Sequence, residues 1–432
     1  MPNAISLNTP VKLPDLVPIG SSPEVIEVSR SGVKSTKQKF RLPYLKLLVT
    51  TLLFATSAAF ASSQVLIPKT SQTPRRLPLS KFYDTPDPLP SGQPGELIRA
   101  EPFYEYLLPY TISAVRILYH SRSSQEKDVA ASGVVLLPRG TPPPGGWPII
   151  AWAHDLTGSA RQCAPSLIKT LNEGPLFSMY VGLGYAVVAS DYAGLGANFP
   201  YAVLDVPSNA QDVINSVAAA REALPQLGSK WLVAGYAYGS RVAVGVAEAI
   251  PKNSNNEFLG AIGILGVADP LEFLEQLAQA PSNPMLVFLA QGIKNQHPEF
   301  PVDDMLTSQG MTLYKILADS CEAPSEQVPD SKELAKPAWQ NNPYIKDFFS
   351  RNALGRKSAF SPVLLISGET AGDVPASLTA ALVGRLCQQK DHVLFVNYPG
   401  LNPSAVLGNS VGEQVSWIRA RFSGQPAPSN CH

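Results

Sequence analysis

Short uninterrupted apolar runs recur along the chain and alternate with stretches of helical periodicity. The runs lie at residues 134–137, 148–153, 185–190, 231–236, 261–265, 363–366 and 393–396. Because they are apolar throughout rather than alternating, they are typical of strands covered on both faces. Between the third and fourth runs the pattern predicts a helix over 208–224, with Ser208 and Gln211 at capping-box spacing. Strands that alternate with helices predict an α/β fold with a mostly parallel central sheet flanked by helices.

The interval between the fifth and sixth runs, about 95 residues, is too long for a simple crossover. It carries helical patterns at 271–279, 303–319 and 343–353 among polar and Pro-rich stretches. We therefore expect a mainly helical cap, inserted over the edge of the sheet where ligands bind in open α/β folds. The predicted division is a core at 96–267 and 355–424, a cap or lid at 268–354, and a Pro-rich lead-in at 62–95.

Residues 1–61 are predicted to be a preamble followed by an export signal. Basic residues between positions 34 and 46 precede an uncharged run from Leu47 to Ala61, which ends in Ala59-Phe60-Ala61. A basic flank, a short apolar run and an A-x-A site are the parts of a signal peptide, and the run is shorter than the roughly 20 residues of a membrane span. Two interpretations stay open: a secreted or periplasmic protein cleaved after Ala61, or a protein anchored to the membrane by the uncleaved run.

The overall charge and the cysteines limit the functions and the cellular compartments that fit this sequence. The 432 residues include 34 basic and 34 acidic side chains, and this balance argues against a nucleic-acid binder, which would need a basic face. The four cysteines, Cys163, Cys321, Cys387 and Cys431, all lie beyond Ala61. Two disulfides in any of three connectivities fit an exported protein, and buried free thiols are the alternative. Because the Cys and His residues lack zinc spacing, we expect no metal site. We expect no cofactor either.

Residues 235–239, Gly-Tyr-Ala-Tyr-Gly, follow the fourth apolar run and precede a helical pattern over 240–250. Gly-x-Ser-x-Gly at such a strand-to-helix turn presents the nucleophile of α/β-hydrolases. Here the central residue is Ala237, whose methyl group cannot attack a carbonyl. Tyr236 and Tyr238 flank it, and packing or ligand contact is their expected role.

Several separate segments, in order, resemble the secretory lipase family, the lipase-A-like branch of the α/β-hydrolases. They are the opening segment 83–103, the loop 151–166 with Trp-Ala-His-Asp, the Asp-Tyr-Ala-Gly-Leu-Gly turn at 191–196, the elbow at 235–239, and the segment 301–307 with the downstream Cys321. The likeness runs from about residue 83 to residue 422. It implies an α/β-hydrolase fold and the hydrolysis of lipid or smaller acyl esters outside the cytoplasm.

The chain departs from the family pattern at each position that the resemblance assigns to the catalytic triad. Ala237 stands at the nucleophile, Ala371 at the acid in 368–375, and Pro403 at the base that follows Tyr-Pro-Gly. Asp155 follows His154 near the oxyanion hole, where the family usually has glycine. A carboxylate there would repel a developing oxyanion unless it points away or is protonated.

Displaced residues offer a poor replacement for this chemistry. Ser240 lies about 5 Å along the helix from position 237, and Asp373, two residues past the acid position, lacks a base. Among the histidines, His154 is expected to orient its loop, while His297 and His120 are expected at the surface. The favoured hypothesis is a pseudoenzyme that binds an apolar or acyl ligand or a protein partner. The alternatives are an active lipase or carboxylesterase with non-standard catalytic residues, and a membrane-anchored structural protein.

Overall fold

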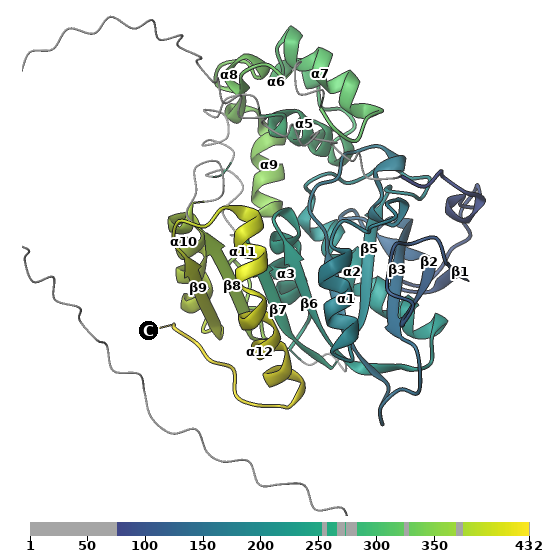
Figure 1. The fold of residues 1–432 in the computed structure, drawn as a ribbon. Coiled ribbons are helices and arrows are strands. Elements are labelled where there is room, and N and C mark those ends of the chain that lie inside the picture. The colour runs from purple at the N-terminus through teal and green to yellow at the C-terminus, as the bar shows by residue number, and fades with distance from the viewer. Residues whose placement is uncertain are drawn as a thin grey trace, which may run out of the picture. The chain divides into compact units, whose positions relative to one another are not determined.

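The structure, a computed structural model, describes residues 76–252, 257–265, 273, 283–323, 328–368 and 375–431. These residues form a nine-stranded sheet in the order β1-β2-β3-β5-β4-β6-β7-β8-β9 (Figure 1). The strands are β1 (Leu97–Pro102), β2 (Ile112–Arg122), β3 (Asp128–Pro138), β4 (Trp147–Ala153), β5 (Ala186–Ala193), β6 (Leu227–Tyr236), β7 (Phe258–Ile264), β8 (Val363–Gly368) and β9 (Val393–Tyr398). Neighbours from β5 across to β9 pair parallel, whereas β1, β2 and β3 form an antiparallel edge that joins β5.

Helices flank this sheet. They are α1 (Gly174–Gly182), α2 (Val206–Ala223), α3 (Tyr238–Ala249), α5 (Met285–Gln296), α6 (Val302–Met305), α7 (Ser308–Ala318), α8 (Ser331–Leu334), α9 (Pro343–Asn352), α10 (Ala376–Gln388), α11 (Pro403–Asn409) and α12 (Val411–Phe422). Helices α2 and α3 pack against each other and against the sheet, α1 packs on β3 and β5, and α12 packs on β7. All residues of β5 and β8 are buried, as expected for strands covered on both faces. Among the helices of the described ranges, none has the length and apolar character to cross a membrane.

The predicted mostly parallel α/β sheet is confirmed, and each of the seven apolar runs overlaps a strand. The sequence pattern missed β1 and β2. Strand β2 includes Arg116, His120 and Arg122 among its apolar residues, so it does not read as an uninterrupted run. His120 was expected at the surface; that expectation was wrong, because its ring is buried and lies 3.0 Å from the carboxylate of Asp128.

Two helix boundaries differ from the prediction. Helix α2 begins at Val206, and Asp205 rather than Ser208 caps it, by accepting a hydrogen bond from the backbone N–H of Ser208. The helix predicted over 303–319 is interrupted at Leu306, which forms an isolated bridge with Ala335, so α6 and α7 are separate. The predicted helix at 271–279 lies outside the described residues apart from residue 273.

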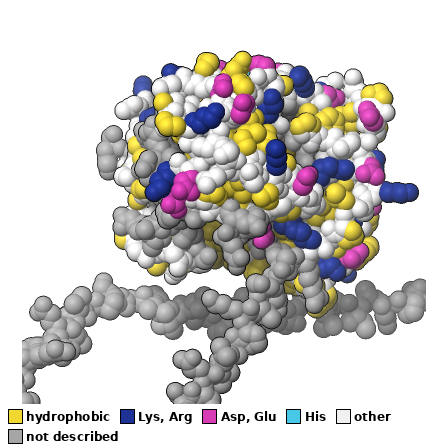
Figure 2. All heavy atoms as spheres, turned by 90° about the horizontal axis from the view of Figure 1, so that it is seen from above, with side chains coloured by type: hydrophobic (Ala, Val, Ile, Leu, Met, Phe, Trp, Pro, Cys, Tyr) yellow, Lys and Arg dark blue, Asp and Glu magenta, His cyan; other side chains and the backbone are white. Residues whose placement is uncertain are grey.

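The helices α5 to α9, which follow β7 and precede β8 in the chain, lie together beyond one end of the strands (Figure 1). They contact the loops that follow β4 and β5. Ser159 donates a hydrogen bond to the carbonyl oxygen of Leu317, and Gln162 donates one to that of Asp319, both at 2.8 Å. On the face seen from above (Figure 2), basic and acidic side chains of the described residues are interspersed. The residue limits of core and cap stay a prediction.

Two disulfides confirm the predicted pairing of all four cysteines. Cys163, in the loop after β4, bonds to Cys321, which follows α7, and Cys387 of α10 bonds to Cys431 near the C-terminus. The first bond therefore joins the loop after β4 to the helices beyond the sheet. The structure selects this connectivity from the three that the sequence left open.

Candidate functional site

The turn between β6 and α3 places Ala237 in a strained backbone conformation. Its φ is 50° and its ψ is −116°, close to the first central position of a type II′ turn, which favours glycine. The turn is held on both sides: the N–H of Ala237 donates to the carbonyl oxygen of Ile264 in β7, and the N–H of Ser240 donates to the carbonyl oxygen of Ala237, each at 3.0 Å. The predicted strand–turn–helix geometry is therefore present at residues 235–239.

Close approach of β6, α3 and β4 accounts for the two glycines of this turn. A Cβ on Gly235 would lie 2.0 Å from the carbonyl oxygen of Gly239, and a Cβ on Gly239 would lie 2.0 Å from that of Ala153. Both distances are far below van der Waals contact, so neither position accepts a side chain. The two glycines thus permit the close approach of β6, α3 and β4 that forms the turn.

The loop after β4 brings Asp155 against the first amide of α3. Oδ1 of Asp155 accepts hydrogen bonds from the N–H of Tyr238 at 3.1 Å and from the N–H of Leu156 at 2.7 Å. Burial raises the pKa of this carboxyl group above its ordinary value, and the two N–H donors oppose the rise. The carboxyl group of Asp155 thus accepts a hydrogen bond from the backbone N–H of Tyr238, the residue that immediately follows Ala237.

His154 is buried and turned away into the loop. Its Nε2 lies 3.1 Å from the carbonyl oxygen of Asp191 and its Nδ1 lies 2.5 Å from that of Asp155, while the ring stacks on Tyr192 with centroids 4.1 Å apart. Burial lowers the pKa of His154 to about 4, and the two backbone carbonyl oxygens beside its ring nitrogens oppose this shift. These contacts hold the ring between the loop after β4 and strand β5.

Three tyrosines link the turn to the loop after β5. The ring of Tyr192 lies 6.5 Å from that of Tyr238 and 6.3 Å from that of Tyr201. The hydroxyl of Tyr238 donates to Oδ1 of Asn209 in α2 at 2.7 Å. Tyr238 is therefore a packed and hydrogen-bonded residue of the site.

Three buried polar atoms near this cluster have no hydrogen-bond partner among the described residues: the hydroxyl of Tyr201, Nδ2 of Asn209 and Oε1 of Gln291 in α5. The sequence analysis singled out none of these residues. No sequence motif distinguishes these residues, and Gln291 reaches this region only through the packing of α5. Native proteins leave few such groups unsatisfied.

Two further carboxyl groups have pKa values raised by their surroundings. Burial, with a smaller contribution from the charge of Asp155, raises the pKa of Glu173 to about 8. Burial also raises the pKa of Asp212 to about 7. Glu173 precedes α1 and lies within the electrostatic influence of Asp155, so a second carboxyl group stands near the turn that the sequence analysis did not identify.

The remaining predicted site residues are placed as follows. Ser240 is buried in the first turn of α3, and its hydroxyl donates to the carbonyl oxygen of Ala237 at 2.6 Å. Tyr236 ends β6 and is half-buried. His297 follows α5, and its Nε2 lies 3.0 Å from the carboxylate of Asp347 in α9. Ala371 and Asp373 lie outside the described residues, and Pro403 begins α11.

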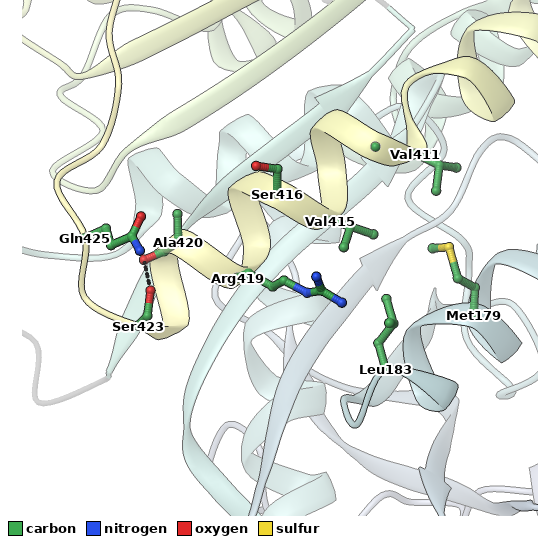
Figure 3. A pocket seen from close by; sticks show the side chains of 10 residues that line it. Met179, Leu183, Val411, Val415, Ser416, Arg419, Ala420, Ser423 and Gln425 are labelled. Carbon is green, nitrogen blue, oxygen red and sulfur yellow. Dashed lines mark hydrogen bonds between the residues drawn. The ribbon is translucent and has the colours of Figure 1, made fainter. Parts of the chain in front are cut away.

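Two hollows on the described surface differ in their lining. A groove of about 700 Å³ between α1 and α12 is lined mainly by apolar side chains such as Met179, Leu183 and Val415, with the basic side chain of Arg419 among them (Figure 3). A cleft of about 420 Å³ lies between α5, α7 and the loops after β4 and β5, and both Tyr201 and Gln291 line it. The three unpartnered atoms named above belong to no residue of the groove, and two of them belong to residues of the cleft.

The family of the chain follows from comparison with known proteins. A family model described as secretory lipase matches residues 166–430, more than half of the sequence. The chain belongs to the secretory lipase family. No curated protein sequence matches it significantly.

Solved structures share the fold of this secretory lipase family member at low sequence identity. Candida antarctica lipase A superposes with a TM-score of 0.69 at 17% identity, over 82% of this chain and 89% of that one. The rice cell wall degrading esterase LipA from Xanthomonas oryzae has a TM-score of 0.63 at 19% identity, over 77% and 98%. A putative hydrolase from Legionella pneumophila has a TM-score of 0.64 at 18% identity, over 76% and 98%. The predicted α/β-hydrolase fold is thereby confirmed.

Proposed function

We propose that this protein is a non-catalytic member of the secretory lipase family that binds an apolar or acyl ligand, or a protein partner, beneath its cap. The observation that carries the proposal is the turn at Ala237. Its backbone keeps the strained conformation that exposes a nucleophile in α/β-hydrolases, yet its side chain is a methyl group. Loss of the nucleophile or base costs about 10⁶ in kcat.

The surroundings of the turn support this proposal. The Ser240 hydroxyl is bonded to the backbone of its own helix, and both nitrogens of His154 face backbone carbonyl oxygens. Among the described residues, Ser240 and His154 are not hydrogen-bonded to each other, as a nucleophile–base pair would be. The family resemblance puts Ala371 and Pro403 where the acid and base would stand.

Asp155 affects whether an oxyanion could be stabilised at this turn. Its carboxyl group accepts a hydrogen bond from the N–H of Tyr238. In α/β-hydrolases the N–H at this position, directly after the nucleophile, contributes to the oxyanion hole. As a carboxylate it competes with an oxyanion for this donor. Protonated, it is neutral and offers an O–H donor of its own.

An esterase assay tests the proposal. The purified protein would be given p-nitrophenyl esters with short and long acyl chains, and a neutral fluorescent apolar probe, N-phenyl-1-naphthylamine, would report ligand binding. We expect binding of the probe without turnover. Turnover within a few orders of magnitude of ordinary lipases, abolished by a substitution in the site, would contradict the proposal. Covalent labelling by a fluorophosphonate would do the same and would reveal a displaced serine nucleophile.

We also propose that the protein acts outside the cytoplasm. Its two disulfides and its membership of the secretory lipase family support this location. The predicted signal at Leu47 to Ala61 lies outside the described residues. N-terminal sequencing of the mature protein should find a start at Ser62; a chain that retains residues 47–61 would instead be membrane-anchored.

A further inference from the structure

The loop that joins β1 to β2, residues 103–111, exposes a group of large hydrophobic side chains. Tyr104, Leu107 and Tyr110 are 80%, 62% and 85% exposed. They are three of the six large hydrophobic side chains that are well exposed in the described part of the chain, and they fall within seven consecutive residues. Single exposed apolar residues are ordinary, whereas a contiguous group marks a contact surface.

Tyr104 and Tyr110 lie next to each other in the folded loop. Both line a hollow of about 130 Å³ together with Arg139, which follows β3. Arg139 is exposed, and its guanidinium has no hydrogen bond or ion pair with any residue that the structure describes. The carboxylate of Glu105, the acidic residue of the loop, lies 3.9 Å from Nζ of Lys169, so these two charges compensate each other. The patch therefore combines two accessible aromatic rings with an uncompensated positive charge.

The loop is held to the rest of the protein by residues other than its exposed side chains. The hydroxyl of the buried Tyr106 donates a hydrogen bond to the carbonyl oxygen of Ser166. The backbone N–H of Leu107 donates one to the carbonyl oxygen of Lys169, and both bonds measure 2.8 Å. The folded loop thus presents its exposed side chains from a fixed backbone.

The dimensions of the patch limit what it can bind. A hollow of about 130 Å³ is smaller than the roughly 300 to 1,000 Å³ that is usual for small-molecule pockets. A stable protein–protein interface takes about 20–30 residues and about 800 Å² from each partner, far more than three side chains supply. Attachment to a lipid surface depends on buried apolar area and on attraction to anionic lipids, and it requires neither a deep pocket nor a matching shape.

The residue types of the patch suit a lipid surface. Tyrosine is enriched at membrane–water interfaces, because its apolar ring and its polar hydroxyl match the two sides of the headgroup region. A basic side chain close to the surface adds an attraction to anionic headgroups. Arg139 can supply this attraction, since no carboxylate of the described residues pairs with it.

We propose that the loop 103–111 attaches the folded protein to the surface of a bilayer that contains anionic phospholipids. The three exposed side chains of the loop lie among the headgroups, and the guanidinium of Arg139 lies beside a lipid phosphate. This attachment goes beyond the proposed function, and it does not involve the predicted run at 47–61 or the cleft beneath the cap.

Sedimentation with sucrose-loaded vesicles tests the residues of the patch. The vesicles contain phosphatidylcholine alone or with about a third of phosphatidylglycerol. We expect Tyr104→Ser, Leu107→Ser and Tyr110→Ser each to lower the partition coefficient roughly three- to tenfold, the factor for removing part of one large apolar side chain from water. Arg139→Gln should lower it roughly fivefold on the anionic vesicles and leave it unchanged on phosphatidylcholine. The control is Phe360→Ser, at a 56% exposed position that precedes β8, which should not change binding.

A second measurement reports on the loop itself. Tyr110→Trp and Phe360→Trp each place a fluorophore at an exposed position, and vesicles of brominated phosphatidylcholine with phosphatidylglycerol quench a tryptophan that enters them. We expect the fluorescence added by Tyr110→Trp to be quenched and that added by Phe360→Trp to be unaffected. This difference decides the matter alone if residues 47–61 are retained and hold every variant on the vesicles.

Three results overturn the proposal and leave the proposed function standing. The first is the absence of quenching in Tyr110→Trp on vesicles that bind the protein. The second is unchanged partitioning of all three serine variants of the loop in protein that starts at Ser62. The third is a dimer, seen by sedimentation velocity, that dissociates in Tyr110→Ser, because it would assign the patch to a second copy of the chain.

Discussion

Ala237 has a backbone conformation that favours glycine and a methyl side chain that cannot act as a nucleophile. In active hydrolases the residue at such a turn is the nucleophile, and strained backbone conformations are common at active sites. They persist only where the surrounding structure enforces them. Here the enforcing contacts are still present: Gly235 and Gly239 allow β6, α3 and β4 to approach closely, and the Ala237 N–H is bonded to β7. The turn is therefore maintained by close packing and by backbone hydrogen bonds.

Replacing Ala237 by glycine should stabilise the protein or leave its stability unchanged. Positive φ costs alanine about 1–2 kcal/mol relative to glycine, and the extra entropy of unfolded glycine offsets about 0.5–1 kcal/mol of that. We expect the free energy of unfolding to rise by up to about 1 kcal/mol in urea titrations. The control is Ala218→Gly, at an exposed position inside α2, which should lose about 1 kcal/mol. A comparable loss at position 237 would show that the turn is not strained.

Restoring the serine alone should not restore catalysis. In Ala237→Ser the described His154 would not serve as a base, because its two ring nitrogens face the backbone carbonyl oxygens of Asp155 and of Asp191 in β5. Removal of a base typically costs about 10⁶ in kcat. We expect hydrolysis of p-nitrophenyl butyrate by this variant to stay near the level of the parent protein. Rapid labelling of the introduced serine by a fluorophosphonate would show that another residue activates it.

At the scale of elements, the Cys163–Cys321 bond matters because it joins two different layers. It ties the loop after β4 to the chain that leaves α7, and Gly158 lies against it: a Cβ there would approach Cys321 Cα to 2.7 Å and Cys163 Sγ to 2.8 Å. The cap helices are thus covalently held over the loop that carries His154 and Asp155. A cap that swings open as a free lid is incompatible with this bond.

Removal of the two disulfides should have unequal effects. The bonds close loops with sequence separations of 158 and 44 residues. The entropy that a disulfide removes from the unfolded chain grows with the logarithm of the length of the loop it closes. Paired Cys→Ser substitutions should therefore cost about 1 kcal/mol more for Cys163–Cys321 than for Cys387–Cys431. Urea unfolding of the two double variants measures the difference. A larger loss for the shorter loop would indicate that native contacts, rather than chain entropy, decide the effect.

At the scale of the whole molecule, buried ionisable groups make stability depend on pH. The folded-state pKa values of Glu173, about 8, and Asp212, about 7, lie above their ordinary values of 4.5 and 3.8. The folded protein therefore keeps protons that the unfolded chain releases, and the associated stability is lost as pH rises through 7 and 8. For His154, whose pKa falls from 6.5 to about 4, stability is lost as pH falls through that interval.

The two carboxyl groups lower the free energy of unfolding between their unfolded pKa values, near 4, and their folded ones, and His154 opposes this below about pH 6.5, so the net decline should be clearest between about pH 6.5 and pH 8. Glu173→Gln should flatten this decline, because glutamine is neutral at every pH. Glu333→Gln, at an exposed position of α8, serves as the control and should leave the slope unchanged. Chemical unfolding at a series of pH values checks both variants, and an unaltered slope in Glu173→Gln would mean that its carboxyl group is solvated.

Local pattern determined the features that depend on neighbours in the sequence. Uninterrupted apolar runs located the strands from β3 to β9, and the glycines at 235 and 239 located the turn of Ala237, because both depend on a few consecutive residues. Where polar residues interrupted the pattern, as in β2, the prediction failed. The N-cap of α2 was misplaced because Asp205 and Ser208 both offer capping side chains, and the observed start is set by the packed chain.

The sheet, the family and the absence of a nucleophilic side chain at position 237 could be predicted from residue types at short spacing, without the structure. The connectivity of the disulfides, the contact of Asp155 with the amide of Tyr238, and the placing of Tyr201 and Gln291 along one cleft depend on tertiary packing. These relations join residues separated by 83 to 158 positions in two cases, and the third joins the core to a cap helix. No periodicity links such positions, because their proximity arises only when β4, β5 and the cap pack around a common cleft.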